Sequence, residues 1–162
     1  MARKIKNQEK RWNSPHYFRS SRNGIDGDMM KISKTLYDQM INHGLQELPY
    51  EACGLLAGAE QGHIRSVWPL KNEWKSSTRF YVSKKVVEET LEQIGLKGQK
   101  VLAVYHSHPA TAPYPSYTDL KNHTEYGVKM VIVSYKTSYP HTKCFSISEK
   151  SYDEHPFLID FS

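Results

Sequence analysis

Residues 100–109, KVLAVYHSHP, hold the most informative pattern in this chain of 162 residues. The run from Lys100 to Tyr105 is continuously apolar after its first residue, as in strands that are buried on both faces of a sheet. It leads directly into the quartet HSHP. Proline cannot donate a hydrogen bond to a neighbouring strand, so we expect the strand to stop at Pro109 and a loop to follow.

Two amphipathic helices are expected before this strand, and each follows a serine that can cap a helix N-terminus. Ser33 opens the first, which Pro49 ends, and Ser83 opens the second, which Gly95 or Gly98 closes. The apolar stripes predict which residues these helices bury. They are Leu36, Met40, Ile41, Leu45 and Leu48 in the first helix and Val86, Val87, Leu91 and Ile94 in the second.

Short apolar runs predict further strands on both sides of the central one. The expected strands are 52–58, 64–70, 128–134, 144–147 and 157–159, and a short helix is expected from Tyr117 to Glu125. The resulting order is helix, two strands, helix, strand, helix and three strands. This order predicts an α/β domain in which a mixed sheet of about six strands is flanked by helices.

The two histidines of the central run can meet at one point. Residues i and i+2 of a strand point to the same side, so the imidazoles of His106 and His108 can face one space. Imidazole is a good zinc ligand, and a catalytic zinc site combines three protein ligands with one open position. Asp119 lies ten residues beyond Pro109 and could be the third ligand. Such a site suits hydrolysis, which also needs a base for the attacking water, and Glu51 is the candidate.

Each part of this pattern also has an ordinary structural explanation. A His-x-His pair in a strand is often incidental, and Ser116-x-x-Asp119 is also a capping box, in which both side chains only close the start of a helix. A glutamate between a helix and a strand, such as Glu51, is usually solvated surface. The joint occurrence of the histidines, proline, serine and aspartate at the mouth of one buried strand is what favours a metal site.

The residues in this arrangement resemble the JAMM signature of the MPN (Mov34/PAD-1) metalloproteases. The matching parts are Glu51 in EACGLLAG, the quartet His106-Ser107-His108-Pro109 and, after six further residues, Ser116-x-x-Asp119. A stretch that members carry before their central helix is also similar, with Asn72, Ser76, Ser77, Arg79 and Phe80. The resemblance covers about residues 30–160. It implies a three-layer α/β fold like that of the cytidine deaminases.

The resemblance also implies a role for each matched residue. His106, His108 and Asp119 would bind one zinc ion per chain, with water in the fourth position. Glu51 would be the general acid and base, and Ser116 would stabilise the oxyanion or orient Glu51. Ser107 is expected to serve the loop. The implied activity is that of a zinc-dependent metallopeptidase or isopeptidase.

The resemblance suggests substrates as well. The domain has no room for large insertions, and small prokaryotic members are associated with ubiquitin-like sulfur carriers or small peptides. We therefore expect hydrolysis of an amide bond at the C-terminal tail of a ubiquitin-like or sulfur-carrier protein, or in a small peptide. Tyr105, Tyr114 and Tyr117 could line a groove for that tail or could merely pack loops. The alternative is a catalytically idle MPN interaction module whose basic leader binds nucleic acid or an acidic partner.

Charge and composition define the remaining expectations. Residues 1–28 hold seven basic and three acidic side chains, so residues 1–29 are expected to be a basic, disordered leader and 30–162 the catalytic domain. No apolar run approaches the ~20 residues of a membrane helix, which excludes a spanning protein, and nucleic acid is not the expected partner. The oligomeric state stays open.

The cysteines and remaining histidines add no further site to these expectations. Two cysteines, Cys53 and Cys144, cannot build a disulfide framework or a four-thiolate zinc site, and a cytoplasmic location is expected. Cys53 is expected to be buried filler. The histidines outside the motif have no ligand spacing and are expected at the surface: His16, His43, His63, His123, His141 and His155.

Overall fold

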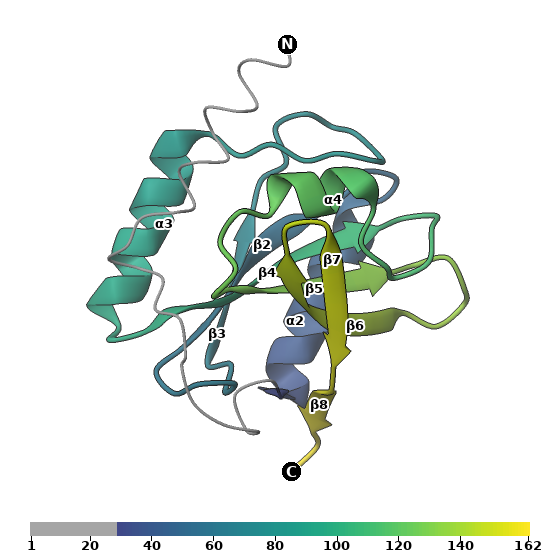
Figure 1. The fold of residues 1–162 in the computed structure, drawn as a ribbon. Helices are drawn as coiled ribbons and strands as arrows, with labels where there is room; N and C mark the ends of the chain where they lie inside the picture. Colours follow the sequence, from purple (N-terminus) through teal and green to yellow (C-terminus); the bar gives the residue numbers. More distant parts are fainter. Residues whose placement is uncertain (1–28) are drawn as a thin grey trace.

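The computed structural model describes residues 29–162, so the predicted leader at 1–29 lies outside the described residues except for Met29. The described chain contains three helices and eight strands (Figure 1). Their order is β1 (Met30–Ser33), α2 (Lys34–Glu47), β2 (Cys53–Gly58), β3 (Ser66–Leu70), α3 (Lys84–Leu96), β4 (Lys100–His108), α4 (Tyr117–Asn122), β5 (Lys129–Ser134), β6 (His141–Ser148), β7 (Ser151–His155) and β8 (Phe157–Asp160). None of these described helices has the length and apolar character needed to cross a membrane.

Six strands form one mixed sheet in the order β3-β2-β4-β5-β6-β7. β4 pairs antiparallel with β2 and parallel with β5, and all the other neighbouring pairs are antiparallel. The parallel pair brings the ends of β4 and β5 to the same edge of the sheet, where His108 lies opposite Ser134. The prediction of a mixed sheet built around the 100–109 run is confirmed.

The end of the chain departs from the expectation. The predicted strand at 157–159 is β8, which leaves the main sheet and pairs in parallel with β1. The sixth strand of the main sheet is instead β7, whose polar sequence SYDEH gives no strand signal. The number of strands in the main sheet was therefore predicted correctly, but one of its members was not.

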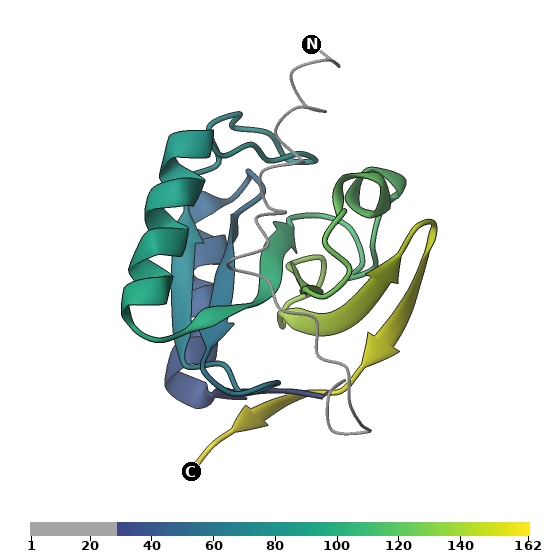
Figure 2. The ribbon, with the colours of Figure 1, turned by 60° about the vertical axis from the view of Figure 1, so that its left-hand side comes forward.

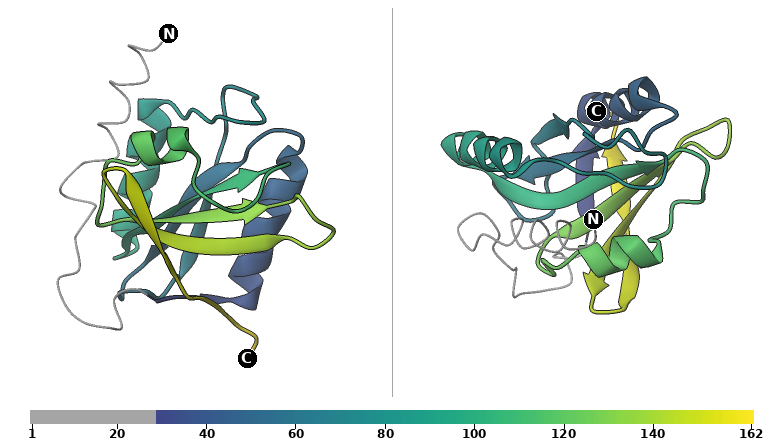
Figure 3. Two further views of the ribbon diagram at one scale, coloured as in Figure 1. Left: turned by 45° about the vertical axis from the view of Figure 1, so that its right-hand side comes forward. Right: turned by 90° about the horizontal axis from the view of Figure 1, so that it is seen from above.

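Helices cover both faces of the main sheet (Figures 2 and 3). α2 and the β1–β8 pair pack on one face, where Leu56 shares a core cluster with Met40. α3 packs on the other face, where the adjacent Leu55 shares a cluster with Leu91. α4 lies on that second face as well, with Leu120 against the apolar side chains of β5 and β6. These three layers are the α/β arrangement that the sequence predicted.

The long helices begin where predicted, but their buried faces differ in part from the predicted stripes. The Ser33 hydroxyl caps α2 by accepting the Leu36 N–H at 3.2 Å, whereas Ser83 precedes α3 without a side-chain capping bond. α2 buries Gly44, because a residue without Cβ lets the Tyr135 ring approach the helix. The expectation of burial was wrong for Leu45, Leu48 and Val86, which are exposed. Leu48 lies beyond the end of its helix.

Candidate active site and metal centre

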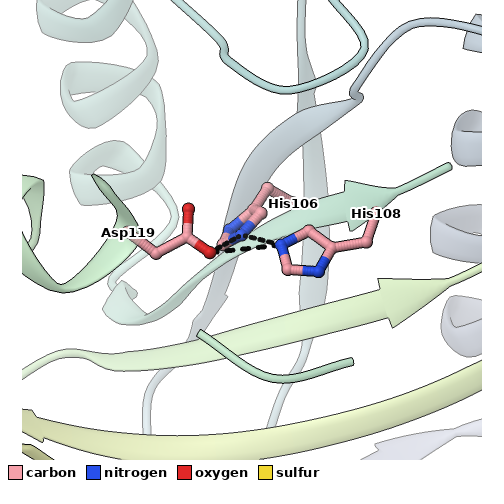
Figure 4. A group of neighbouring side chains, drawn as sticks. All are labelled: His106, His108 and Asp119. Carbon is pink, nitrogen blue, oxygen red and sulfur yellow. Dashed lines mark hydrogen bonds and ion pairs between the residues drawn. The ribbon is translucent and has the colours of Figure 1, made fainter. Parts of the chain in front are cut away.

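β4 carries both motif histidines because the strand continues past its apolar run and ends at His108. Pro109 follows directly, as expected for a residue that cannot donate a hydrogen bond to the sheet. The alternation of the strand places the rings of His106 and His108 together on the face that α4 covers (Figure 4). Both rings are buried, and their centroids lie 5.1 Å apart.

Asp119 approaches the same point from the first turn of α4 (Figure 4). Its side chain accepts the Ser116 N–H at 2.9 Å, and the Ser116 hydroxyl accepts the Asp119 N–H at 3.0 Å, so the predicted capping box is present. The same carboxylate oxygen, Oδ2, lies 3.2 Å from His106 Nε2 and 3.1 Å from His108 Nε2. Asp119 therefore caps α4 and lies beside the histidines at the same time, through a single oxygen.

The three donor atoms form a nearly equilateral triangle. The Nε2 atoms of His106 and His108 are 3.2 Å apart, and Asp119 Oδ2 completes sides of 3.2 and 3.1 Å. Ligands at about 2.0–2.1 Å from a tetrahedral zinc ion lie about 3.3 Å from one another. Within residues 29–162, these three side chains form a group able to hold a metal ion. Both the spacing and the donor types fit zinc.

Two neighbours orient the histidine rings, and neither has a direct signal in the sequence. His108 Nδ1 lies 2.9 Å from the carbonyl oxygen of Ala112, which can only accept, so Nδ1 carries a proton and Nε2 is the ring nitrogen that can bind a metal ion. The Phe80 ring packs against the His106 ring with 5.4 Å between centroids. A backbone carbonyl leaves no trace in a sequence, and Phe80 stood out only through the family resemblance.

Glu51 lies between α2 and β2 and is buried beside the histidines, with 2% of its surface exposed. Its Oε1 is 3.8 Å from His106 Nε2, and within the described residues this oxygen has no hydrogen-bond partner. Burial raises the pKa of Glu51 to about 7, although the nearby His106 opposes the shift. Solvated surface is therefore the wrong interpretation of Glu51, whose carboxyl group can change protonation near neutral pH.

Ion pairing outweighs burial at His106 and Asp119. Desolvation lowers the pKa of His106, but Asp119 and Glu51 together raise it to about 9. Desolvation raises the pKa of Asp119, but its contacts with His106, His108 and the Ser116 N–H hold it well below the usual range of a carboxyl group. Asp119 is thus ionised throughout the neutral pH range, as a metal-binding carboxylate must be.

Ser107 does not serve the loop, as the sequence had suggested. It is buried within β4, between the two histidines and on the opposite side of the strand. Its hydroxyl accepts the Ala52 N–H at 2.7 Å, and its own N–H donates to the Ala52 carbonyl at 2.9 Å. Ser107 therefore ties the histidine-bearing strand to the residue that follows Glu51.

The three tyrosines expected around the site lie in different places. Tyr105 is buried on the far side of β4, where its hydroxyl is 2.8 Å from His43 Nδ1. Of the two interpretations left open for Tyr105, that of lining a groove is wrong, because successive residues of a strand face opposite sides. Tyr114 and Tyr117 are exposed, and their contact with a substrate tail stays a prediction.

The other histidines are mostly less exposed than predicted. The half-buried ones are His43, His63, His123 and His155, whereas His141 is exposed. His16 lies outside the described residues. Side-chain hydrogen bonds account for three of the half-buried ones, namely His43, His123 and His155. The expectation of buried filler is confirmed for Cys53, and both it and Cys144 are buried and free.

Comparison with known proteins covers the same part of the chain as the site. A family model that describes prokaryotic homologues of the JAB domain matches residues 33–147, which include Glu51, the two histidines and Asp119. The CysO-cysteine peptidase of Mycobacterium tuberculosis is 30% identical over 137 residues, which cover 81% of this chain and 91% of that protein. A probable TtuB-protein conjugate cleaving protease of Thermus thermophilus is 31% identical over 99 residues, which cover 60% of this chain and 66% of that protein. The solution structure of a protein from Desulfitobacterium hafniense has a TM-score of 0.76 and 29% identity, covering 83% of this chain and 94% of that one.

Proposed function

Since the chain belongs to the family of prokaryotic homologues of the JAB domain, we propose that it is a zinc-dependent peptidase or isopeptidase. The proposed bond is an amide at the C-terminal tail of a ubiquitin-like or sulfur-carrier protein. The observation that carries the proposal is the triangle of His106, His108 and Asp119 beside the unpartnered carboxylate oxygen of Glu51. A purely structural metal site needs no buried acid at its side, whereas amide hydrolysis needs a group that moves protons.

Glu51 is the proposed general base and acid. A zinc ion held by His106, His108 and Asp119 would supply Lewis acidity, which polarises a scissile carbonyl and lowers the pKa of water. The raised pKa of Glu51, about 7, suits a group that takes a proton from the attacking water and returns it to the leaving nitrogen. Its free Oε1 is the atom available for that proton.

Ser116 is the proposed oxyanion donor. Its hydroxyl oxygen accepts the Asp119 N–H, so the proton of the same hydroxyl remains available for a negative charge that develops on the substrate. Ser116 is exposed at the start of α4, where a substrate carbonyl can reach it. A cap and an oxyanion donor can thus be one residue.

The substrate class rests on the names of two relatives, a CysO-cysteine peptidase and a probable TtuB-protein conjugate cleaving protease. The second name describes cleavage of a protein conjugate, and the first describes a peptidase that acts on CysO-cysteine. They support a carrier-protein conjugate over a free peptide as the substrate of this chain.

The test is cleavage of three probes by the zinc-loaded full chain: CysO–cysteine, a TtuB–protein conjugate and a short peptide aryl amide. We expect at least one conjugate to be cleaved faster than the aryl amide, with activity lost on chelation and restored by zinc. Glu51→Gln should keep the zinc and lose about 10²–10⁴-fold in rate. Failure to cleave any probe, or equal cleavage by Glu51→Gln, would overturn the proposal.

A further inference from the structure

Asn72 is a buried polar residue outside the metal triangle, at the neck of the loop between β3 and α3. Only 4% of its surface is exposed. The loop closes on itself at this point, because the Glu73 N–H donates to the Tyr81 carbonyl at 2.9 Å. Burying an amide side chain is costly unless its donors and acceptors are all paired, so its partners define what it does.

Every polar atom of the Asn72 amide is used. Its Nδ2 donates to the carbonyl oxygens of Glu51 and Arg79, both at 2.9 Å. Its Oδ1 accepts the N–H groups of Trp74 and Tyr81, both at 3.1 Å. Carbonyls only accept and N–H groups only donate, so these partners fix the orientation of the amide. One side chain therefore joins both arms of the loop to the main chain of Glu51.

The same loop holds Glu51 from its other side. The Glu51 N–H donates to the Ser76 carbonyl at 2.7 Å, so residues 72–81 bind both polar groups of the Glu51 main chain. Phe80, from the same loop, packs on His106. Within the described residues the carboxylate Oε1 has no such partner. The acid is thus fixed through its main chain and free at one carboxylate oxygen.

We propose that Asn72 is a positioning residue for the amide hydrolysis, which holds Glu51 beside His106 through the main chain. This inference rests on the proposed function. A group that takes and returns a proton must be kept within reach of the reacting atoms, and a small displacement costs much of the rate. Hydrogen bonds to the carboxylate would also hold it, but they would occupy the oxygen that receives the proton. Hydrogen bonds to the main chain of Glu51 hold the residue and leave that oxygen free.

Asn72→Asp is the most specific variant, because it keeps the side-chain size and the acceptor for Trp74 and Tyr81 but removes both donors. On the conjugate that the wild type cleaves fastest, kcat should fall about 10–100-fold, while KM and zinc content stay close to the wild-type values. A wild-type kcat would overturn the proposal.

Ser66→Ala is the matched control. The Ser66 hydroxyl also makes two side-chain hydrogen bonds, with Gln99 Oε1 at 2.5 Å and Trp68 Nε1 at 2.7 Å, but at the opposite end of β3 from Asn72. Its loss removes a comparable number of contacts without touching Glu51, so kcat should not change. A fall in kcat equal to that of Asn72→Asp would mean that lost stability explains both, and would overturn the proposal.

A double variant shows whether Asn72 acts through Glu51. In the Glu51→Gln background, Asn72→Asp should have no further effect on the residual rate, because the group it positions is already disabled. An equal loss in both backgrounds would contradict the proposal. If the buried aspartate prevents folding, the same measurements are made on Asn72→Ala, which removes all four hydrogen bonds.

Hydrogen exchange gives a readout that needs no activity. Asn72→Asp should speed exchange of the Glu51 amide about tenfold and leave the amides of α2 unchanged, whereas Ser66→Ala should affect neither. If the wild type cleaves none of the probes, the proposed function fails. The exchange rate of the Glu51 amide then tests by itself whether Asn72 holds the main chain of Glu51. Unchanged exchange at Glu51 would then show that Asn72 does not hold it.

Discussion

Asp119 Oδ2 accepts the Ser116 N–H and contacts both histidine nitrogens, so a single atom belongs to a helix cap and to the candidate metal site. Glu51 Oε1 is the opposite case, a buried oxygen that makes no hydrogen bond within the described residues. Asp119 is an ionised carboxylate stabilised by hydrogen-bond donors, whereas Glu51, with a pKa of about 7, can exchange a proton. Substitutions at single residues can therefore separate the cap, the ligand and the base.

Ser116→Ala tests whether the cap is also an oxyanion donor. Loss of the capping bond should lower stability by about 1 kcal/mol. Loss of the hydroxyl proton at the site should in addition lower turnover by about 10–10³-fold while zinc stays bound. Thermal unfolding, metal analysis and kcat on the same preparation measure the three quantities. A stability loss with unchanged turnover would leave Ser116 as a cap alone.

His43 should make part of the stability depend on pH. Burial lowers the pKa of His43 below 6.5, although Glu47 opposes the shift. The unfolded chain therefore takes up this proton first as the pH falls through 6.5, and the folded state loses stability in that window. The Tm of the wild type should drop more than that of His43→Gln between about pH 7.5 and 5.5. Parallel Tm curves for the two proteins would contradict this account.

At the scale of elements, local patterns were sufficient for β4 and the two long helices. The apolar run, the following proline and the capping serines lie within a few residues of the structures they predict. β7 and β1 escaped prediction because both strands are short, and β7 is also polar. The strand predicted at 157–159 is present as β8, but its pairing with β1 was not predicted. β7 is held by its neighbour in the chain, β6, in an antiparallel pair where Ser148 lies opposite Ser151. β1 and β8 instead come from opposite ends of the described chain, and no local pattern records such a pairing.

The same limit applies to the site. The spacing of His106, His108 and Asp119 is local, since it needs only the alternation of a strand and the first turn of a helix. The attachment of Asn72 to Glu51 spans 21 residues and joins a side chain to a carbonyl oxygen. The link from Ser107 to Ala52 is of the same kind, over 55 residues. Contacts to the main chain between distant segments follow from the fold and cannot be predicted from a motif.

Gly54→Ala tests how closely β2 and β4 must approach. A Cβ at Gly54 would lie 2.4 Å from ring atoms of Tyr105, which is buried and directly precedes His106. The overpacking should cost about 1–3 kcal/mol. Gly98→Ala is the control, because a Cβ there meets no atom within 4 Å and the cost comes from its positive φ of 69°. A Gly54→Ala protein as stable as the wild type in urea unfolding would contradict the close packing.

In the whole molecule, the candidate metal site joins β4 to α4, and few other contacts of the described residues hold α4 in place. β4 is central in the sheet, whereas α4 buries none of its residues. Its attachments on the described chain include the partly buried Leu120, the Asp119 contacts with the two histidines and the His123 side chain on the Val128 carbonyl. A bound ion would fix α4 to the sheet through one further set of bonds.

Removal of zinc should therefore loosen α4 first. Binding energy adds to the stability of the folded state, so chelation should lower the Tm of the full chain. Hydrogen exchange should accelerate at the amides of α4, while those of α2, on the other face of the sheet, stay protected. Equal acceleration in both helices, or none, would show that the ion does not bridge α4 and β4.

The most direct measurement is the zinc content of the purified full chain, determined together with turnover on the best carrier conjugate. We expect one zinc per wild-type chain, one zinc and almost no turnover in Glu51→Gln, and no zinc in His106→Ala, His108→Ala or Asp119→Ala. This follows because His106, His108 and Asp119 supply the three donors, whereas Glu51 lies beside them, 3.8 Å from His106. Tightly bound zinc in Asp119→Ala, or near-normal turnover in Glu51→Gln, would contradict the assignment.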